Sequence, residues 1–220
     1  MTRQKPTSLR YRVPTGDQGG FQPGSHGRVL RNRLGITSKR AMDVAEFEAL
    51  ASIHEIYFDR IESETRFTAA LICQMHRDWL GSLYSWAGSY RTVELAKGNF
   101  KWPPAYLVEQ NMRALEWNTL NHLTPCRPGA TGQVLQAMAV VHAELLLIHP
   151  FREGNGRLAR WLADLMAAQA GLPLPGYRFS GRGALRERQM YLKAVQLGYG
   201  GDYQALADFF ACALERGRLT

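Results

Sequence analysis

The chain has 220 residues, enough for one hydrophobic core, and its apolar fraction of 45% is ordinary for a globular protein. Three cysteines without a CxxC pair favour reduced thiols over a disulfide framework. No stretch has the roughly 18–20 consecutive apolar residues of a membrane span, and no apolar core follows the basic N-terminus as in a signal peptide. These features predict a cytoplasmic protein without a membrane partner.

The net charge of +8 is concentrated at one end of the chain. Residues 1–40 hold nine Lys and Arg against the single acid Asp17, whereas the other 180 residues hold 18 of each sign. We therefore expect a basic arm over residues 1–33 and one domain over residues 34–220. The balanced body argues against a nucleic-acid-binding protein. The arm could contact nucleic acid, an acidic partner or an anionic surface, or be a solvated loop.

Apolar periodicity predicts a mostly helical domain. Thr37 or Ser38 can cap the first helix, whose buried apolar face is expected to include Ala41, Val44, Ala45, Phe47, Ile53 and Ile56. Further helices are expected over about 66–80, 104–122, 131–148, 156–171, 184–197 and 202–216. The segment 131–148 is almost free of charge, which predicts a central, buried helix. The fold class is therefore all-α.

Residues 91–102 are the exception to this helical pattern. Apolar residues alternate there on both sides of Lys97-Gly98-Asn99, which is typical of a β-hairpin.

The chemistry is concentrated in residues 149–160, HPFREGNGRLAR. Gly154, Asn155 and Gly156 tolerate positive φ, so their N–H groups can form an anion-binding nest at a helix N-terminus. Arg157 and Arg160 lie three residues apart, hence on one face of the first turn, where both can clamp phosphate.

Two further side chains complete the predicted site. Glu153 offers the hard oxygen ligand that Mg²⁺ prefers beside phosphates. His149 is the only side chain in this segment that can accept a proton near neutral pH. A phosphotransfer site is therefore predicted, the alternative being a surface loop with incidental charges.

This segment fills every specified position of the Fic motif, HxFx(D/E)GNGRxxR, and Tyr84–Arg91 (YSWAGSYR) resembles the family's approach to its flap. The resemblance covers about residues 30–215. It implies a Fic-type helical bundle with a flap hairpin at about 91–102 and a catalytic loop at 149–160. The implied activity is protein adenylyltransfer (AMPylation), the transfer of AMP from ATP to a Ser, Thr or Tyr hydroxyl of a target protein.

The resemblance also implies residue roles. His149 would deprotonate the target hydroxyl, and Glu153 would hold Mg²⁺ between the α- and β-phosphates. Phosphate binding would fall to Gly154, Asn155, Gly156 and Arg157, with Arg160 at the γ-phosphate. The flap would bind the target by strand addition, through Val93, Glu94, Leu95 and Ala96. The alternative for this segment is an ordinary surface hairpin.

Two other sequence patterns resemble known catalytic motifs but are incomplete. His76-Arg77-Asp78 imitates a kinase catalytic loop but lacks its Asn, and His142-Ala-Glu144 imitates a zinc deaminase without the following PCxxC. We therefore expect His142, on the buried helix, to be a structural residue.

Fic proteins are commonly inhibited by a helix carrying (S/T)xxxE(G/N), whose Glu engages the second motif arginine, here Arg160. The only Glu followed by Gly or Asn is Glu153, in the catalytic motif itself. The resemblance thus favours the toxin of a bacterial toxin–antitoxin pair, with a separate antitoxin supplying a Glu to Arg160. The alternative is an effector delivered into a host cell.

Two other activities stay open. One is a Doc-like protein kinase, although Doc proteins carry Lys where this chain has Gly156. The other is an idle nucleotide-binding module, against which the presence of His149 and Arg157 argues.

Overall fold

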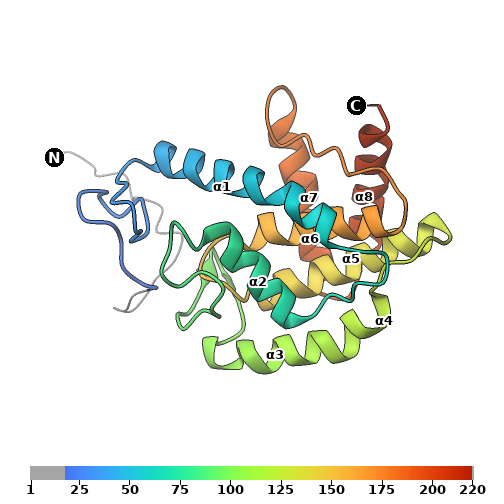
Figure 1. Ribbon diagram of the computed structural model, residues 1–220, viewed down its shortest axis with the longest axis horizontal. Helices are drawn as coiled ribbons and strands as arrows, with labels where there is room; N and C mark the ends of the chain where they lie inside the picture. Colours follow the sequence, from blue (N-terminus) through green and yellow to red (C-terminus); the bar gives the residue numbers. More distant parts are fainter. Residues whose placement is uncertain (1–17, 220) are drawn as a thin grey trace.

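The computed structural model describes residues 18–219, and the described chain folds into the expected helical bundle with a small β-hairpin (Figure 1). Its principal helices are α1 (Lys39–Arg60), α2 (Ala69–Leu80), α3 (Val108–Leu115), α4 (Asn121–Leu123), α5 (Thr131–Ile148), α6 (Asn155–Gln169), α7 (Ala184–Gly198) and α8 (Gln204–Gly217). The hairpin strands are β1 (Ala96–Lys97) and β2 (Phe100–Lys101).

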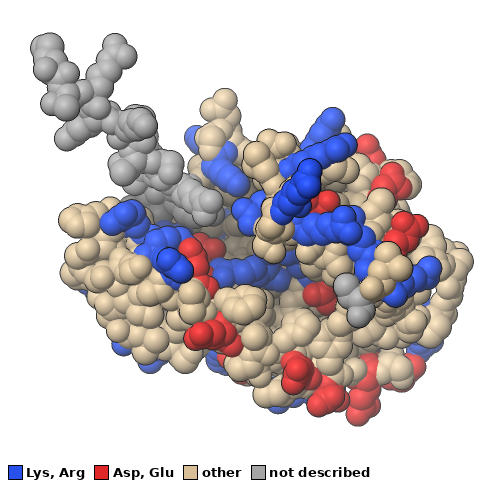
Figure 2. Space-filling model, turned by 90° about the horizontal axis from the view of Figure 1, so that it is seen from above, with Lys and Arg blue, Asp and Glu red and all other residues tan. Residues whose placement is uncertain are grey.

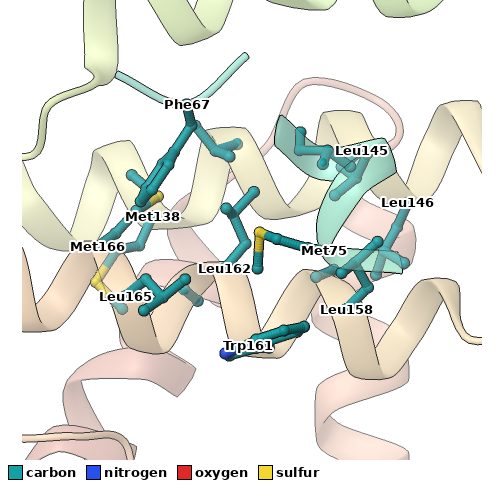
Figure 3. Close-up of a cluster of buried hydrophobic side chains, with 14 of the residues drawn as sticks. Phe67, Met75, Met138, Leu145, Leu146, Leu158, Trp161, Leu162, Leu165 and Met166 are labelled. Carbon is teal, nitrogen blue, oxygen red and sulfur yellow. The ribbon is translucent and has the colours of Figure 1, made fainter. Parts of the chain in front are cut away.

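The core forms around α5, which packs against α3, α6, α7 and α8. Figure 3 shows the centre of this core, where side chains of α5 and α6 meet Phe67 and Met75. α1 packs against both α2 and α6 (Figure 1). Because α5 is the central helix and leads directly into the 149–160 loop, the core fixes where that loop begins.

α5 is not a run of consecutive apolar residues, but it passes a coarser test for a membrane span. This helix has 18 residues and a mean hydropathy of 1.4, enough to cross a membrane by length and composition alone. Ten of its residues are buried within the bundle, so core packing accounts for its apolar composition.

Ser38 caps α1 as predicted, its side chain accepting the Ala41 N–H at 3.3 Å. The predicted buried face is only partly right: Ala45 and Ile53 pack partly buried against the core, whereas Val44 is 48% exposed and Phe47 68% exposed. The buried residues of this helix are instead Met42, Glu46 and Tyr57. Two of them are polar and are buried because they have partners across the bundle, Tyr57 with Asp78 and Glu46 with Tyr84 and Arg157. A hydropathy pattern cannot register such pairs.

The β-hairpin lies where the alternation predicted it. Lys97 pairs with Phe100 across a two-residue turn in which Gly98 has φ +60°. The flanking Val93, Leu95 and Trp102 form a small buried cluster of their own. The hairpin therefore has a core that is separate from the main one.

The predicted helix at 104–122 is interrupted. A 3-10 turn (Ala105–Leu107) precedes α3, and a π-helical segment (Glu116–Leu120) separates α3 from α4. In the predicted basic arm, residues 1–17 lie outside the described part of the chain. Within 18–33, Phe21 bridges to Leu30 and Val29 is buried, so this segment packs against the body.

Candidate active site

His149 lies at the C-terminal end of α5 in an unusual backbone conformation. Its φ of 53° is in the left-handed region, which few residues other than glycine adopt. Its own N–H closes the last helical bond, to the carbonyl of Leu145 at 3.0 Å. The next residue, Pro150, has no N–H, so the Leu146 carbonyl receives no helical donor from it. That carbonyl is therefore available to side chains.

The Leu146 carbonyl fixes the proton position on His149. The imidazole Nδ1 lies 3.2 Å from this oxygen, and Trp102 donates its indole N–H to the same oxygen at 3.0 Å. Because a carbonyl can only accept, Nδ1 carries the hydrogen and Nε2 of the neutral ring keeps a free lone pair. The Trp102 ring packs 4.1 Å from the imidazole between centroids.

The surroundings of His149 keep it uncharged. The pKa of His149 is lowered from 6.5 to about 3, chiefly by burial and to a smaller extent by the positive charges of Arg91 and Lys97, against the opposing hydrogen bond to Leu146. At neutral pH the ring is therefore in the form that accepts a proton.

The loop after His149 is closed by Asn155. Its side chain accepts the Phe151 N–H at 2.9 Å and donates to the Phe151 carbonyl at 2.7 Å. The Phe151 ring is fully buried and stacks on His76 at 3.9 Å between centroids. Because Nδ1 of His76 accepts the Gly88 N–H, its Nε2 donates to the Glu153 carbonyl, at 3.1 Å. α2 thus supports the loop from beneath.

The expected nest is smaller than predicted. Only Gly154 has positive φ, at +86°, and a Cβ there would approach Trp79 to 2.9 Å. Asn155 and Gly156 are already the first residues of α6. The anion-binding donors of this segment are therefore those of a helix N-terminus, and Asn155 can contribute only its main chain because its side chain closes the loop.

Glu153 lies beside these donors. Its Oε1 accepts the Gly154 N–H at 3.0 Å and lies 3.7 Å from the Arg157 guanidinium, with 37% of the side chain exposed. The described residues contain no group of three His, Cys, Asp or Glu that would form a complete metal cage. One accessible carboxylate beside these main-chain donors would nevertheless fit Mg²⁺, which can take most of its ligands from phosphates and water.

The two motif arginines diverge, although their spacing suggested a shared face. Arg157 pairs with Glu46 of α1 at 2.6 Å and lies over the Trp79 ring. Arg160 instead lies over the Phe179 ring, 4.9 Å from its centroid, and near Tyr191. The first arginine is thus engaged by a buried carboxylate, and the second by aromatic rings.

Two cavities meet at this loop. The first, called the flap cavity, has a volume of about 470 Å³ and is lined by Lys97, Gly98, Phe100, Trp102, Leu146, His149, Glu153, Gly154, Asn155, Gly156, Arg160, Tyr191, Leu192, Val195, Gln196 and Tyr199. The second, called the arginine cavity, has about 440 Å³ and is lined by Arg28, Val29, Leu30, Lys39, Met42, Asp43, Glu46, Tyr84, Glu153, Arg157, Arg160 and Arg188. Glu153 and Arg160 belong to both. In Figure 2, Lys and Arg side chains gather around a hollow on this face.

The structure thus brings His149, Glu153, Gly154–Gly156 and Arg160 together on one cavity, while Arg157 lines only the other. In the flap, the side chains of Val93 and Leu95 are buried, whereas Glu94 is exposed. The Leu95 carbonyl accepts the Trp102 N–H, so the neighbouring backbone groups of Glu94 and Ala96 point to the outer edge.

Sequence reasoning missed three residues of the site: Glu46, His76 and Trp102. Each lies far from 149–160 in sequence. Trp102 belonged to the predicted hairpin, and His76 appeared only in the tripeptide that imitates a kinase catalytic loop. The expectation for His142 agrees with the structure. It is 2% exposed and bonds to the Ala159 carbonyl and the Tyr191 hydroxyl.

Residues 66–167 match the model of the Fic/DOC family. Over 187 residues the chain is 29% identical to the probable protein adenylyltransferase y4lH of Sinorhizobium fredii, covering 84% of this chain and 90% of that protein. It is 28% identical to the protein adenylyltransferase VbhT of Bartonella schoenbuchensis, covering 87% of this chain but 37% of that protein. A crystal structure of BepC from Bartonella tribocorum with bound AMPPNP has the same fold, with a TM-score of 0.69, 20% identity, and coverage of 84% of this chain and 91% of that one.

Proposed function

This chain carries a Fic/DOC family domain, and we propose that it is a protein adenylyltransferase that moves AMP from ATP to a Ser, Thr or Tyr hydroxyl of a target protein. The observation that carries the proposal is the flap cavity, in which a neutral histidine, a carboxylate and a helix N-terminus meet. Relatives named protein adenylyltransferases support it.

In the proposed reaction, His149 is the general base. Its Nε2 takes the proton of the target hydroxyl as that oxygen attacks the α-phosphorus. The bond from this phosphorus to the β-phosphate oxygen breaks, so diphosphate leaves and an AMP ester remains on the target. Such a base contributes typically 10²–10⁴-fold to the rate. The negative charge of bound ATP would raise the pKa of His149 from its low value and make it a stronger base.

The phosphates would lie on the N-terminus of α6. The main-chain donors of Gly154, Asn155 and Gly156 favour anions there. Arg160 lies in the wall of both cavities and would bind the γ-phosphate, while Arg157 would offset charge from the arginine cavity. Glu153 would hold Mg²⁺, which in such a site offsets phosphate charge.

The remaining walls of the flap cavity suit the rest of the reaction. Phe100, Leu146, Leu192 and Val195 offer an apolar lining for a nucleobase. The outer edge of the flap at Glu94 and Ala96 would bind the target in extended form by strand addition. Room at Gly156, where a Cβ would meet only Arg160 at 3.6 Å, favours adenylyl transfer over a Doc-like kinase reaction.

We further propose that the chain acts in the bacterial cytoplasm as the toxin of a toxin–antitoxin pair. Among residues 18–219, no carboxylate lies within 4 Å of Arg160. The buried Glu46 engages Arg157 instead. A glutamate supplied by a partner could therefore reach Arg160 and compete with the γ-phosphate.

The test is a comparison of two ATP labels in bacterial lysate with Mg²⁺. Label from α-³²P-ATP on protein, lost in His149→Ala, would support adenylyl transfer, and the target should gain about 329 Da. Label from γ-³²P-ATP alone, with a gain of about 80 Da, would show phosphate transfer. No label from either would favour a binding module. If a small protein is encoded beside this chain and is its antitoxin, co-expression of that protein should suppress labelling.

A further inference from the structure

Arg91 is a buried cation whose side chain donates four hydrogen bonds, each to a main-chain carbonyl oxygen. The residue is 1% exposed. Its Nε donates to the His149 carbonyl at 2.8 Å, and its two terminal nitrogens donate to Val93 at 3.0 Å and Pro103 at 2.6 Å. A longer bond of 3.4 Å reaches the Ile148 carbonyl. Fully buried arginines are rare unless paired, so this arrangement calls for an explanation.

The acceptors belong to two parts of the molecule. Ile148 and His149 end α5, where the last carbonyls have no helical donor and a positive charge is favourable. Val93 and Pro103 lie at the two ends of the flap, before β1 and after β2. One guanidinium therefore bridges the end of the central helix and both ends of the hairpin.

Neighbouring contacts keep this bridge in place. The Arg91 N–H donates to the Pro150 carbonyl at 2.8 Å. On either side, Gln18 donates to the Tyr90 carbonyl at 3.1 Å and accepts the Thr92 N–H at 2.8 Å. The backbone of Arg91 is thus held on both sides, and its side chain has little freedom to find other partners.

We propose that Arg91 is a positioning residue that couples the flap to His149, so that the edge presenting the target and the base that deprotonates it keep one fixed geometry. This rests on the proposed function. Displacements of about 1 Å at a reacting centre can cost about 100-fold in rate. A planar fork reaching several carbonyls is specific to arginine, which explains why lysine would be a poor substitute.

The first measurement needs no substrate. In Arg91→Gln, hydrogen exchange should rise together in the flap, residues 93–102, and in residues 146–150. The His149 pKa, followed by NMR, should rise, because a positive charge beside it has been removed. Arg91→Lys keeps the charge but loses the fork. In this variant, hydrogen exchange in the same two segments should be faster than in the unchanged protein, while the His149 pKa should change less than in Arg91→Gln.

The second measurement is activity. Arg91→Gln should lower the transfer rate by roughly 10–100-fold while leaving ATP affinity within about threefold, since Arg91 does not line the phosphate site. In Arg91→Ala, added guanidinium chloride at millimolar concentration should restore part of the rate by filling the vacated space. A merely structural role would give no such rescue.

A matched control is Gln169→Ala at the far end of α6. This buried side chain also joins distant segments by main-chain bonds, to Cys126, Glu62 and Thr65. It should lower stability without moving the His149 pKa or the flap exchange. The proposal is overturned if the flap loosens in Arg91→Gln while residues 146–150 and the His149 pKa stay unchanged. A coupled response in a chain that transfers no AMP would instead overturn only the proposed function.

Discussion

The flap cavity and the arginine cavity share Glu153 and Arg160 but otherwise have contrasting walls. The flap cavity combines His149 with apolar and aromatic side chains. The arginine cavity is lined by five cationic side chains and three acids. An apolar wall suits a neutral nucleoside and protects a proton transfer, whereas a cationic wall suits anions. The contrast predicts that, in the proposed reaction, proton transfer occurs in the flap cavity while the arginine cavity attracts anions.

The largest effect is expected from the flap cavity. His149→Ala should lower the transfer rate by roughly 10²–10⁴-fold, because no other described side chain replaces the base. ATP affinity, measured by calorimetry, should change little. His122→Ala, an exposed histidine on α4, is the control. Loss of ATP binding in His149→Ala would show that this side chain helps to bind the nucleotide and does not act in proton transfer alone.

The shared wall should give the next largest effect. Glu153→Gln keeps an oxygen that can accept the Gly154 N–H but removes the charge that would hold Mg²⁺. We expect the rate to fall on the order of 100-fold and the Mg²⁺ concentration needed for half-maximal activity to rise. The exposed Glu109→Gln is the control. An unchanged Mg²⁺ dependence would argue that Glu153 is not the metal ligand.

Acid should lower the stability of the folded protein through two buried histidines, His76 on α2 and His142 on α5. Burial lowers the pKa of His76 to about 4 and that of His142 to about 3, so both stay neutral when folded while the unfolded chain takes up protons below pH 6.5. Stability is therefore full above this pH and falls as pH decreases, with a slope that approaches about 1.4 kcal/mol per pH unit for each of these two histidines. Urea unfolding from pH 7 to 4.5 tests this.

His142→Asn should reduce that slope, because it removes one of the two buried histidines that take up a proton only on unfolding. A flat stability profile over this range would show that neither histidine is buried and neutral.

The arginine cavity is expected to matter for stability as well as binding. Arg157→Ala would leave Glu46, whose side chain is 4% exposed, without its cation and should cost about 1–3 kcal/mol of unfolding free energy. Glu46→Gln in the same chain should restore part of this loss. Denaturant titrations of the two single variants and the double variant measure the coupling. Additive effects would mean that the pair is not coupled.

The smallest effect on the reaction is expected from an exposed arginine at the edge of the arginine cavity. Arg188 lines the arginine cavity but is exposed. Arg188→Ala should weaken product inhibition by diphosphate by about two- to fivefold at low salt, and the difference should vanish at about 0.5 M salt. The control is Arg113→Ala, because this side chain of α3 is exposed and lies outside the cavity. A salt-independent effect would indicate a direct, desolvated contact.

Features that are local in sequence were predicted well. The long apolar run of α5 and the residue types of the 149–160 loop identified the central helix and the candidate base, metal ligand and phosphate donors. The face of α1 was not predictable, because Glu46 and Tyr57 are buried by partners that lie far along the chain.

The same limit applied to the site. Nothing in the sequence pattern shows that Glu46 meets Arg157, or that His76 supports the Glu153 carbonyl, since these contacts join residues 77 or more positions apart. The divergence of Arg157 and Arg160 also depends on their distant partners, Trp79 and Phe179. Spacing on a helix predicts a shared face, not where long side chains end.

The group that orients the His149 imidazole is a main-chain oxygen, the carbonyl of Leu146, and not a side chain. This oxygen accepts from His149, from Trp102 and, at 3.3 Å, from the Tyr199 hydroxyl, and Pro150 brings no amide hydrogen to compete. Side-chain scanning at position 146 would therefore leave the acceptor untouched. Only chemistry on the backbone itself, such as an ester in place of an amide that weakens this oxygen, would reveal how strongly it governs the imidazole.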